Sequence, residues 1–311
     1  MAPKRLSVVV PAHNEEANIA AIHAAVASAA SDIDVNLEMI FVDDGSRDAT
    51  SDCISKLAAA DGRVKSLAFT RNFGHQAALL AGLRAATGDA VITMDCDLQH
   101  PPRLIPEMVR AWRAGNGVVQ MVRDETVDAG PAKRFMSRNF YRLMNLLSDT
   151  PITAGAADFQ LLDRAAVDAL LRLGDHRPFL RGMVSWLGFR TVSLHYTADA
   201  RTGGATSYTW RRMISMAVDA ITAFSVKPLR IAFYIGCLSA ILSLLYLLYI
   251  FKELLAGHTI EGWTSLMVVL LFLGASQLVT LGIIGEYVGR IYDQTRGRPR
   301  YVVKPDMSSD A

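Results

Sequence analysis

The sequence predicts an α/β fold with a mostly parallel sheet, followed by amphipathic interfacial helices and two transmembrane helices. In the first 123 residues, five apolar segments of strand length alternate with four helical patterns, as is typical of parallel sheets. Nearer the C-terminus, two uncharged apolar runs are each long enough to cross a bilayer. The two patterns together predict a soluble ligand-binding region joined to a membrane hairpin.

The predicted strands end in polar motifs. The strand candidates cover residues 6–11, 39–43, 64–69, 90–94 and 117–122, and the helical patterns cover residues 15–30, 48–60, 75–86 and 102–114. Ligands of parallel sheets bind beyond the carboxyl ends of the strands, and every strand candidate is followed there by charged or amide side chains. Any one of these motifs could be a helix cap, but their common edge predicts a binding site.

The acidic motif Asp95-Cys96-Asp97-Leu98-Gln99-His100 follows the fourth strand candidate. Residues two apart in an extended chain point to the same side, so a strand that reached Asp97 would present both carboxylates together, with Gln99 one step further. Like charges that close are costly unless a cation lies between them. Oxygen ligands of this kind suit Mg²⁺ or Mn²⁺. A capped turn before Pro101-Pro102 is the alternative interpretation.

Residues 231–251 and 263–285 are the predicted membrane spans. The alternative is a pair of buried helices in a soluble protein, but such helices rarely run so long without a charge. Several basic residues precede the first span and follow the second, whereas the connecting loop offers only Lys252. By the positive-inside rule, the soluble region and both termini are expected in the cytoplasm, with the chain crossing the inner membrane twice.

Composition argues against several other classes of protein. The formal net charge of +2 is too small to suggest a nucleic-acid partner. Cys53, Cys96 and Cys237 lie far apart, which indicates neither a disulfide framework nor a zinc site. The first apolar run is broken by Pro11 and is too brief for a signal peptide. Neither a G-x-G-x-x-G nor a G-x-x-x-x-G-K-[ST] motif occurs, which disfavours a dinucleotide site or a P-loop.

The motifs VVVPAHNEE, VDDGSRDAT, RNFGHQAAL and DCDLQHPP, in that order, resemble those of the GT-A type glycosyltransferases of family 2. The resemblance runs from residue 6 to residue 303. Within the family, the chain is similar to the polyprenyl-phosphate glycosyltransferases, which include dolichol-phosphate mannosyltransferase relatives and the undecaprenyl-phosphate glucosyltransferases of O-antigen modification. That narrower resemblance rests on residues 157–161 and 201–208, the two spans and the final GRIYDQTRGRPRYVV. The Gln-x-x-Arg-Trp motif of processive polysaccharide synthases is absent.

The resemblance implies a nucleotide-sugar site on the loops after the first strands. Carried over to this sequence, the residues that would hold the donor are Pro11, Ala12, Asn14, Glu16, Asp43, Asp44, Arg71 and Asp95. Asp43 would face the base, and both uracil and guanine offer N–H groups to a carboxylate. Asp95, Asp97 and Gln99 match the metal ligands of the family. Mg²⁺ or Mn²⁺ there would stabilise the departing nucleoside diphosphate, which gives Asp97 a catalytic role through the metal.

Asp158 matches the catalytic acidic position of the family, where the habitual role is general base. The acceptor would be a lipid phosphate monoester with a second pKa of about 6, so at neutral pH it is already mostly dianionic. We therefore expect Asp158 to orient the acceptor or the sugar, or to take the residual proton from a monoanion. The alternative is a surface helix cap before Asp163-Arg164.

The acceptor phosphate needs cations close to the membrane. The residues that match or lie near the phosphate-binding positions of the relatives are Arg123, Lys133, Ser137 and Arg201. Arginine suits this role because it gives two charge-assisted hydrogen bonds at once. Residues 134–147 and 208–226 mix basic and apolar side chains, which predicts amphipathic helices in the headgroup layer. An ordinary core-packed helix is an equal alternative for residues 134–147.

The expected activity is inverting transfer of a sugar from a nucleotide donor, UDP-glucose or a related UDP-sugar, to undecaprenyl phosphate. The alternatives are a GDP-mannose-dependent polyprenyl-phosphate mannosyltransferase, a transferase of a modified aminosugar and a non-catalytic membrane scaffold. The expected division is a catalytic domain (1–207), a juxtamembrane helix (208–228), two spans with a short outer loop (229–289) and a basic cytoplasmic tail (290–311). Small residues at Gly274-Ala275-Ser276 permit a homo-oligomer.

Overall fold

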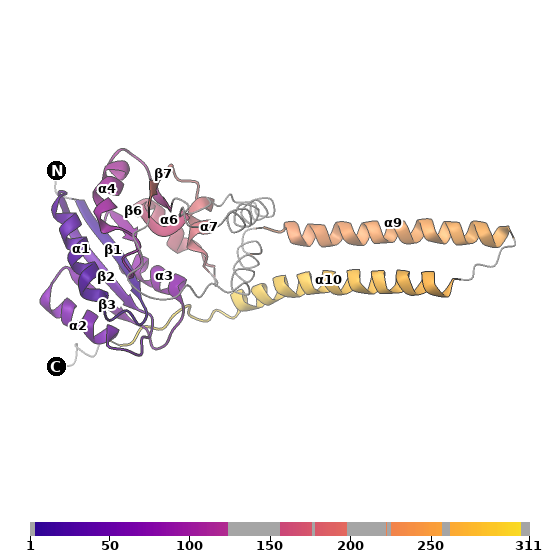
Figure 1. Cartoon of the computed structure of the whole chain (residues 1–311), viewed down its shortest axis with the longest axis horizontal. Helices are drawn as coiled ribbons and strands as arrows, with labels where there is room; N and C mark the ends of the chain where they lie inside the picture. The colour runs from indigo at the N-terminus through magenta and orange to yellow at the C-terminus, as the bar shows by residue number, and fades with distance from the viewer. Residues whose placement is uncertain are drawn as a thin grey trace. The chain divides into compact units, whose positions relative to one another are not determined.

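The computed structural model of the protein describes residues 4–123, 156–175, 178–197, 222, 225–256 and 262–305. The chain divides into two compact units (Figure 1). The first comprises Met1–Asn145, Thr150–Ile214 and Pro299–Ala311, and the second comprises Leu146–Asp149 and Ser215–Arg298. The C-terminal segment after the last helix therefore belongs to the first unit.

The first unit is built on a seven-stranded sheet with the strand order β3-β2-β1-β4-β6-β5-β7 (Figure 1). The strands are β1 (Lys4–Ala12), β2 (Val35–Asp43), β3 (Val64–Ala68), β4 (Ala90–Thr93), β5 (Val118–Arg123), β6 (Ala156–Asp163) and β7 (Thr191–Tyr196). Only β6 is antiparallel to its neighbours, β4 and β5; the other pairs are parallel. The predicted mostly parallel α/β sheet is confirmed, and β6 and β7 are additions to the five predicted strands.

Helices cover both faces of the sheet (Figure 1). On one face lie α1 (Ile19–Ser31), α2 (Thr50–Ala60), η1 (Pro102–Leu104) and α4 (Ile105–Arg113), and on the other lie α3 (His75–Ala85), α6 (Arg164–Arg172) and α7 (Leu180–Trp186). Helix α3 packs so closely on β1 that a Cβ atom at Gly82 would lie 2.2 Å from Val9 Cγ1. Because both faces are covered, the central strands are almost continuously apolar, as β1 and β2 show.

The direction of β6 decides where its first residues lie. Thr93, the last residue of β4, pairs with Gln160 in the antiparallel register. The hydroxyl of Thr93 also donates to the backbone oxygen of Asp158 (2.6 Å). Asp158 therefore lies at the edge where the parallel strands end, although it comes near the beginning of its own strand.

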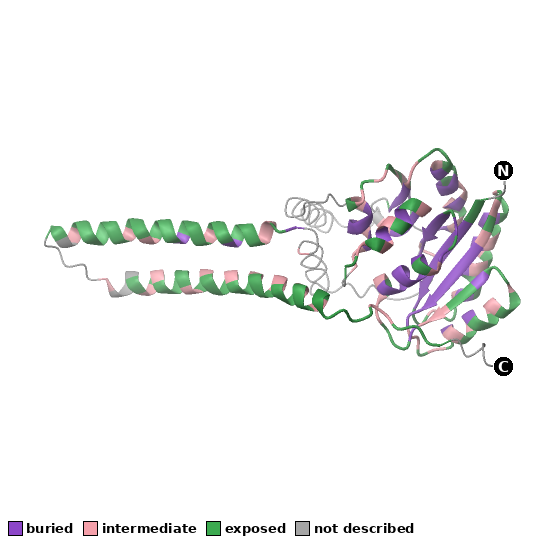
Figure 2. Cartoon of the chain, turned by 180° about the vertical axis from the view of Figure 1, so that it is seen from behind, coloured by how far each residue is buried: buried purple, intermediate pink, exposed green. Residues whose placement is uncertain are grey.

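The second unit contains two long apolar helices, α9 (Lys227–Leu255) and α10 (Trp263–Thr295), which contact each other. Their segments Lys227–Glu253 and Leu266–Thr295 are long and apolar enough to cross a membrane, and each contains an 18-residue stretch with a mean hydropathy of 2.3. Most of their described residues are exposed, coloured green in Figure 2. A helix from a soluble core would bury its apolar side chains, so length, composition and exposure together favour association with a membrane.

Candidate active site

The loops after β1 and β2 are held together by hydrogen bonds at the carboxyl edge of the sheet. Asn14 lies in the left-handed region at φ 57°. Its backbone N–H donates to Ser46 Oγ (3.0 Å), and its side-chain oxygen accepts from the backbone N–H of Arg47 (2.9 Å). The Glu16 carboxylate accepts from the backbone N–H of Ala49 (2.9 Å). Asn14 and Glu16, both predicted to bind the sugar nucleotide, thus join the two loops. Their contact with a nucleotide stays a prediction.

The neighbouring carboxylates Asp43 and Asp44 have different surroundings. Asp44 accepts hydrogen bonds from the backbone N–H groups of Phe73 (2.7 Å) and Gly74 (2.9 Å). Burial raises its pKa even though these bonds oppose the shift. Asp43 Oδ1 accepts from the backbone N–H of Ser46 (2.9 Å), but its buried Oδ2 has no hydrogen-bond partner in the described part of the chain. Since such an atom is costly to leave unpaired, Asp43 Oδ2 is suited to accept a hydrogen bond from a bound ligand.

At Gly45, the loop after β2 (the second loop) lies close against the loop after β3 (the third loop). Its φ is +65°, and a Cβ atom there would lie 2.3 Å from the carbonyl carbon of Arg71. Only glycine combines this backbone conformation with so close an approach. The guanidinium of Arg71 lies over the Phe73 ring, 4.0 Å from its centroid. The structure thus brings Asp43, Asp44 and Arg71 onto adjoining loops, with Pro11 and Ala12 buried at the end of β1.

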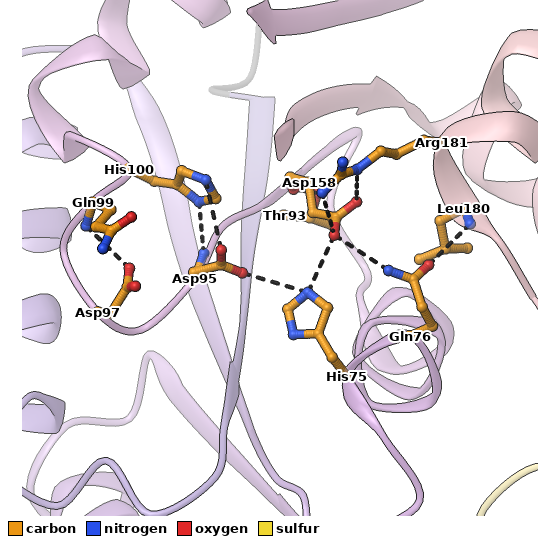
Figure 3. A network of polar contacts seen from close by, with 10 residues as sticks. All are labelled: His75, Gln76, Thr93, Asp95, Asp97, Gln99, His100, Asp158, Leu180 and Arg181. Carbon is orange, nitrogen blue, oxygen red and sulfur yellow. Dashed lines mark hydrogen bonds and ion pairs between the residues drawn. The ribbon is translucent and has the colours of Figure 1, made fainter. Parts of the chain in front are cut away.

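The premise of a strand that reaches Asp97 is wrong. β4 ends at Thr93, and the chain turns, with Leu98 in the left-handed region at φ 60°. The turn is fixed by hydrogen bonds from the backbone N–H of Asp95 to His100 Nδ1 (2.9 Å) and from that of Gln99 to Asp97 Oδ1 (3.1 Å). Figure 3 shows the carboxylates of Asp95 and Asp97 pointing to different neighbours. Strand alternation therefore does not bring them together.

Asp95 lies between two histidines (Figure 3). Its Oδ1 is 3.4 Å from His75 Nε2, and its Oδ2 is 3.6 Å from His100 Nε2. Burial lowers the pKa of His100, although the charges of the nearby aspartates would raise it. Because His100 Nδ1 accepts from a backbone N–H, the proton of the neutral ring lies on Nε2.

The surroundings of Asp95 offer oxygen ligands to the expected divalent cation. Its Oδ1 is buried and accepts no hydrogen bond from the residues that the structure describes. Among those residues there is no group of three His, Cys, Asp or Glu side chains that could hold a metal ion. The open carboxylate oxygen, a second carboxylate and an amide oxygen nonetheless have the chemistry that Mg²⁺ or Mn²⁺ takes, with phosphate and water completing the shell. The donor set therefore fits.

The Asp158 carboxylate is buried and fully partnered (Figure 3). Arg181 donates from Nε to Oδ1 (2.7 Å) and from Nη2 to Oδ2 (3.0 Å). Gln76 Nε2 donates to Oδ2 (3.2 Å), and His75 Nε2 lies 3.4 Å from the same oxygen. Burial alone would raise the pKa of Asp158, but the charge of Arg181 and the hydrogen bonds from His75 and Arg181 hold it well below its ordinary range.

His75 connects the two acidic groups. Its Nε2 is 3.4 Å from both Asp95 Oδ1 and Asp158 Oδ2. Burial would lower its pKa, but the hydrogen bond that it donates to Asp158 and the charges of both aspartates raise it. Two carboxylates that come from different strands are therefore held beside one imidazole.

Sequence reasoning did not foresee four of these residues: His75, Gln76, His100 and Arg181. The first three lie inside motifs that were already quoted, so their position beside the other motifs was the available signal. Arg181 had none, because it is a single arginine on the short helix α7. Arg123, predicted to bind the acceptor, ends β5 and donates to Gln99 Oε1 (3.4 Å). Lys133, Ser137, Arg201 and residues 134–147, as well as most of residues 208–226, lie outside the described residues.

Comparison with known families identifies the fold that carries this site. Residues 7–171 match the model described as Glycosyl transferase family 2, and residues 227–291 match the model described as GtrB C-terminal hairpin. The chain belongs to glycosyltransferase family 2. The resemblance drawn from the four sequence motifs and the two spans is therefore confirmed.

Relatives of this family 2 glycosyltransferase match it along nearly its whole length. The uncharacterized glycosyltransferase YkcC of Bacillus subtilis (strain 168) is 40% identical over 299 residues, which are 96% of this chain and 93% of that protein. A bactoprenol glucosyl transferase of Shigella phage SfX is 38% identical over 301 residues, which are 96% and 99% of the two chains. Among solved structures, glucosyl-3-phosphoglycerate synthase from Mycobacterium tuberculosis, in complex with Mn²⁺, uridine diphosphate and phosphoglyceric acid, is 22% identical. The structural match covers 70% of this chain and 78% of the synthase, with a TM-score of 0.48.

Proposed function

We propose that this glycosyltransferase moves glucose, or a closely related sugar, from a UDP donor to undecaprenyl phosphate, giving a β-linked polyprenyl-phosphate sugar. The observation that carries the proposal is the full-length relationship to bactoprenol glucosyl transferase, at 38% identity over 96% of the chain. The site supports it because the unpartnered oxygens of Asp43 and Asp95 are followed along the same edge by the partnered carboxylate of Asp158.

The donor would lie across the ends of β1, β2 and β4. Asp43 Oδ2 is a hydrogen-bond acceptor suited to an N–H group of the base. Asp95, Asp97 and Gln99 would hold Mg²⁺ or Mn²⁺, which when bound neutralises charge that develops on the nucleoside diphosphate. The Asp43 contact accepts either uracil or guanine, so the choice of UDP rests on the sequence resemblance to undecaprenyl-phosphate glucosyltransferases.

Asp158 would act by position and not as a general base. Its two oxygens are occupied by Arg181, Gln76 and His75, and its lowered pKa makes it a weak proton acceptor. The acceptor phosphate, mostly dianionic at neutral pH, needs no base. One phosphate oxygen forms a bond to the anomeric carbon as the bond to the nucleoside diphosphate breaks. The electron pair leaves with the diphosphate, and the configuration inverts.

The acceptor phosphate would bind at the same carboxyl edge. Arg123 and Tyr196 end the parallel strands β5 and β7 there, and the predicted acceptor residues Lys133, Ser137 and Arg201 follow these two strands in the sequence. A cluster of such cations would hold a lipid phosphate by charge-assisted hydrogen bonds. The flanking basic residues favour a cytoplasmic catalytic domain and cytoplasmic termini at the inner membrane.

The small residues Gly274, Ala275 and Ser276 in the second span would permit contact between two copies of the chain.

The direct test is product formation by the full-length protein in detergent or in bilayers. Labelled UDP-glucose, other UDP-sugars and GDP-mannose are each incubated with undecaprenyl phosphate and Mn²⁺ or Mg²⁺. We expect a lipid-linked glucose from UDP-glucose, lost when the metal is chelated. A product from GDP-mannose alone would replace the proposal by the mannosyltransferase, and no lipid-linked product with any donor would refute it.

The role of Asp158 is tested by the pH profile of Asp158→Asn. We expect a loss of rate at every pH, because the variant weakens the pairing with Arg181. Asp168→Asn, an exposed aspartate on α6, is the matched control and keeps the wild-type rate. If Asp158→Asn instead kept the wild-type rate above pH 8 and lost it only below pH 6, Asp158 would be the base after all.

A further inference from the structure

The chain after α10 forms a short extended segment, residues 300–304, which we name the C-terminal strap. The backbone N–H of Lys304 donates to the oxygen of Ala68 (2.7 Å), and that of Thr70 donates to the oxygen of Val302 (3.0 Å). Phe69 and Val303 form an antiparallel bridge between these two bonds. Since β3 is the edge strand of the sheet, the strap pairs with the chain where this edge strand ends.

Aromatic contacts continue from the strap into the third loop of the site. The Tyr301 ring stacks on Phe69, with centroids 5.0 Å apart and planes at 12°. Phe69 is fully buried and meets Phe73 edge to face at 5.7 Å. Arg71 in turn lies over Phe73. The strap is thus connected through two phenylalanine rings to the arginine expected in the donor pocket.

Further polar contacts fix the strap in place. The Tyr301 hydroxyl accepts from Arg84 Nη1 on α3 (3.3 Å). Arg300 Nη2 donates to the backbone oxygen of Leu173 after α6 (3.4 Å), and burial lowers the pKa of Arg300. The strap is therefore bound to two helices as well as to the end of β3.

The loop that the strap supports has little regular structure of its own. Residues 69–74 lie between β3 and α3, outside helix and strand. On the donor side, the loop is held by the hydrogen bonds from Phe73 and Gly74 to Asp44 and by its close approach to Gly45. The backbone N–H of Phe69 donates to the oxygen of Asp43 (2.9 Å). Away from these contacts, the strap accepts the backbone hydrogen bond of Thr70 and stacks Tyr301 on the Phe69 ring.

We propose that the C-terminal strap is a positioning element for the donor nucleotide, with Tyr301 as its principal side chain. By fixing Phe69 and Thr70, it keeps the loop against Asp44 and sets the position of Arg71. The inference rests on the proposed function, because the loop affects the donor only if it lines the donor site. It also assigns a role to the chain that follows the second apolar helix, where the basic residues otherwise indicate only membrane orientation.

The test uses two matched pairs of variants in the full-length protein. Lys304→Pro removes the N–H that donates to Ala68, whereas Lys304→Ala keeps it, and the Lys304 side chain is exposed. Tyr301→Ala removes the ring stacked on Phe69, whereas Tyr301→Phe keeps it. We expect Lys304→Pro and Tyr301→Ala to raise the KM for the sugar nucleotide about tenfold. The kcat and the KM for undecaprenyl phosphate should stay within about twofold of wild type.

A general loss of stability is separated from this effect by Val26→Ala. Val26 is buried on α1, away from the strap, so this variant lowers the melting temperature without changing the KM for the donor. A donor KM that rises equally in Val26→Ala, or that stays at the wild-type value in Lys304→Pro, overturns the inference while the proposed function stands.

Hydrogen exchange supplies a readout that does not need turnover. The backbone amides of Phe73 and Gly74 donate to Asp44, and we expect them to exchange faster in Lys304→Pro than in Lys304→Ala. If wild type makes no lipid-linked sugar, the proposed function fails, and this comparison still tests the strap. Unchanged exchange at both amides would show that the strap does not position the loop.

Discussion

Two kinds of buried carboxylate lie toward opposite edges of the same sheet, and they differ in how they are partnered. Toward the amino edge, Glu38 Oε1 accepts from Lys65 Nζ (2.6 Å) and Thr87 Oγ1 (2.9 Å). Its Oε2 accepts from the Ser7 hydroxyl and from the backbone N–H of Thr87 (2.9 Å). Every oxygen of this carboxylate is used inside the protein.

At the carboxyl edge, Asp158 is fully partnered, but the hydrogen bonding of Asp43 and Asp95 is incomplete. Asp43 Oδ2 and Asp95 Oδ1 are buried and accept no hydrogen bond from the described residues. A buried polar atom without a partner destabilises the fold, so these positions carry a cost that Glu38 avoids. The difference teaches that burial alone does not mark a functional acid. An oxygen without a hydrogen bond distinguishes Asp43 and Asp95 from Glu38, whereas Asp158 differs from Glu38 only in its place at the carboxyl edge.

The sharpest way to break this comparison is Asp95→Asn. We expect kcat to fall about 10³-fold, because the divalent cation loses a charged ligand. The melting temperature should change little, since Asp95 Oδ1 accepts no hydrogen bond and the contacts of the carboxylate with His75 and His100 are long, at 3.4 and 3.6 Å. Kinetics and thermal unfolding of Asp34→Asn, an exposed aspartate, provide the control. If Asp95→Asn kept its activity but lost stability, Asp95 would be a structural carboxylate like Glu38 and not a ligand of the cation.

Gly45→Ala tests the loops that present the open oxygens. The new Cβ would lie 2.3 Å from the Arg71 carbonyl carbon, at a φ of +65°, so the second and third loops must separate. We expect the KM for the donor to rise by about tenfold or more, measured at saturating acceptor. Gly62→Ala, which has open space around it, should leave the KM for the donor unchanged. A wild-type KM in Gly45→Ala would mean that the contact between the loops does not shape the donor site.

Glu38→Gln should show the opposite pattern, with lower stability and unchanged activity. Replacing the ionised carboxylate weakens its hydrogen bonds and leaves Lys65 without its ion-pair partner, so the free energy of unfolding should fall by about 2 kcal/mol. The kcat/KM of the folded enzyme should not change, because Glu38 lies away from the carboxyl edge. Denaturant unfolding and steady-state kinetics on the same preparation check both parts. A drop in kcat/KM with unchanged stability would contradict the division between the two edges.

The smallest expected effect is the pH dependence of that stability difference. Burial would raise the pKa of Glu38, but hydrogen bonds from Lys65, Ser7 and Thr87 lower it from 4.5 to about 2. A lowered pKa means that the folded state favours the ionised form, so its stabilisation is complete above about pH 4.5 and is lost as the pH falls toward 2. The stability gap between wild type and Glu38→Gln should therefore narrow over that range in denaturant titrations. A constant gap would indicate that the charge of Glu38 contributes nothing.

Much of the first unit could be predicted because its signals are local. The first five strands and four helical segments follow from the alternation of apolar and polar residues, with shifts of a few residues at their ends. The helix predicted from residue 15 begins at Ile19, because the backbone N–H of Glu15 donates to Thr50 Oγ1 (2.8 Å). Hydrophobic periodicity carries no such information about contacts between loops.

The candidate active-site cluster was harder to predict because its contacts join distant parts of the chain. Periodicity does not reveal strand direction, so the antiparallel β6 and the position of Asp158 beside β4 were not derivable from the pattern. Arg181 reaches Asp158 from another element, and a single arginine has no distinctive sequence context. Alternation along a strand also failed at Asp97, because the hydrogen bonds of the following turn decide where its carboxylate points.

The reversed course of β6 has a further consequence for how such enzymes diversify. The polypeptide departs from the sheet at Arg123 and rejoins it at Ala156, and both points lie on one rim. Insertions, deletions or wholesale replacement between these points leave the backbone ladder of the sheet untouched. A lineage can therefore vary residues 124–155 in length and sequence while it keeps the sheet edge beside which Asp95 and Asp158 lie.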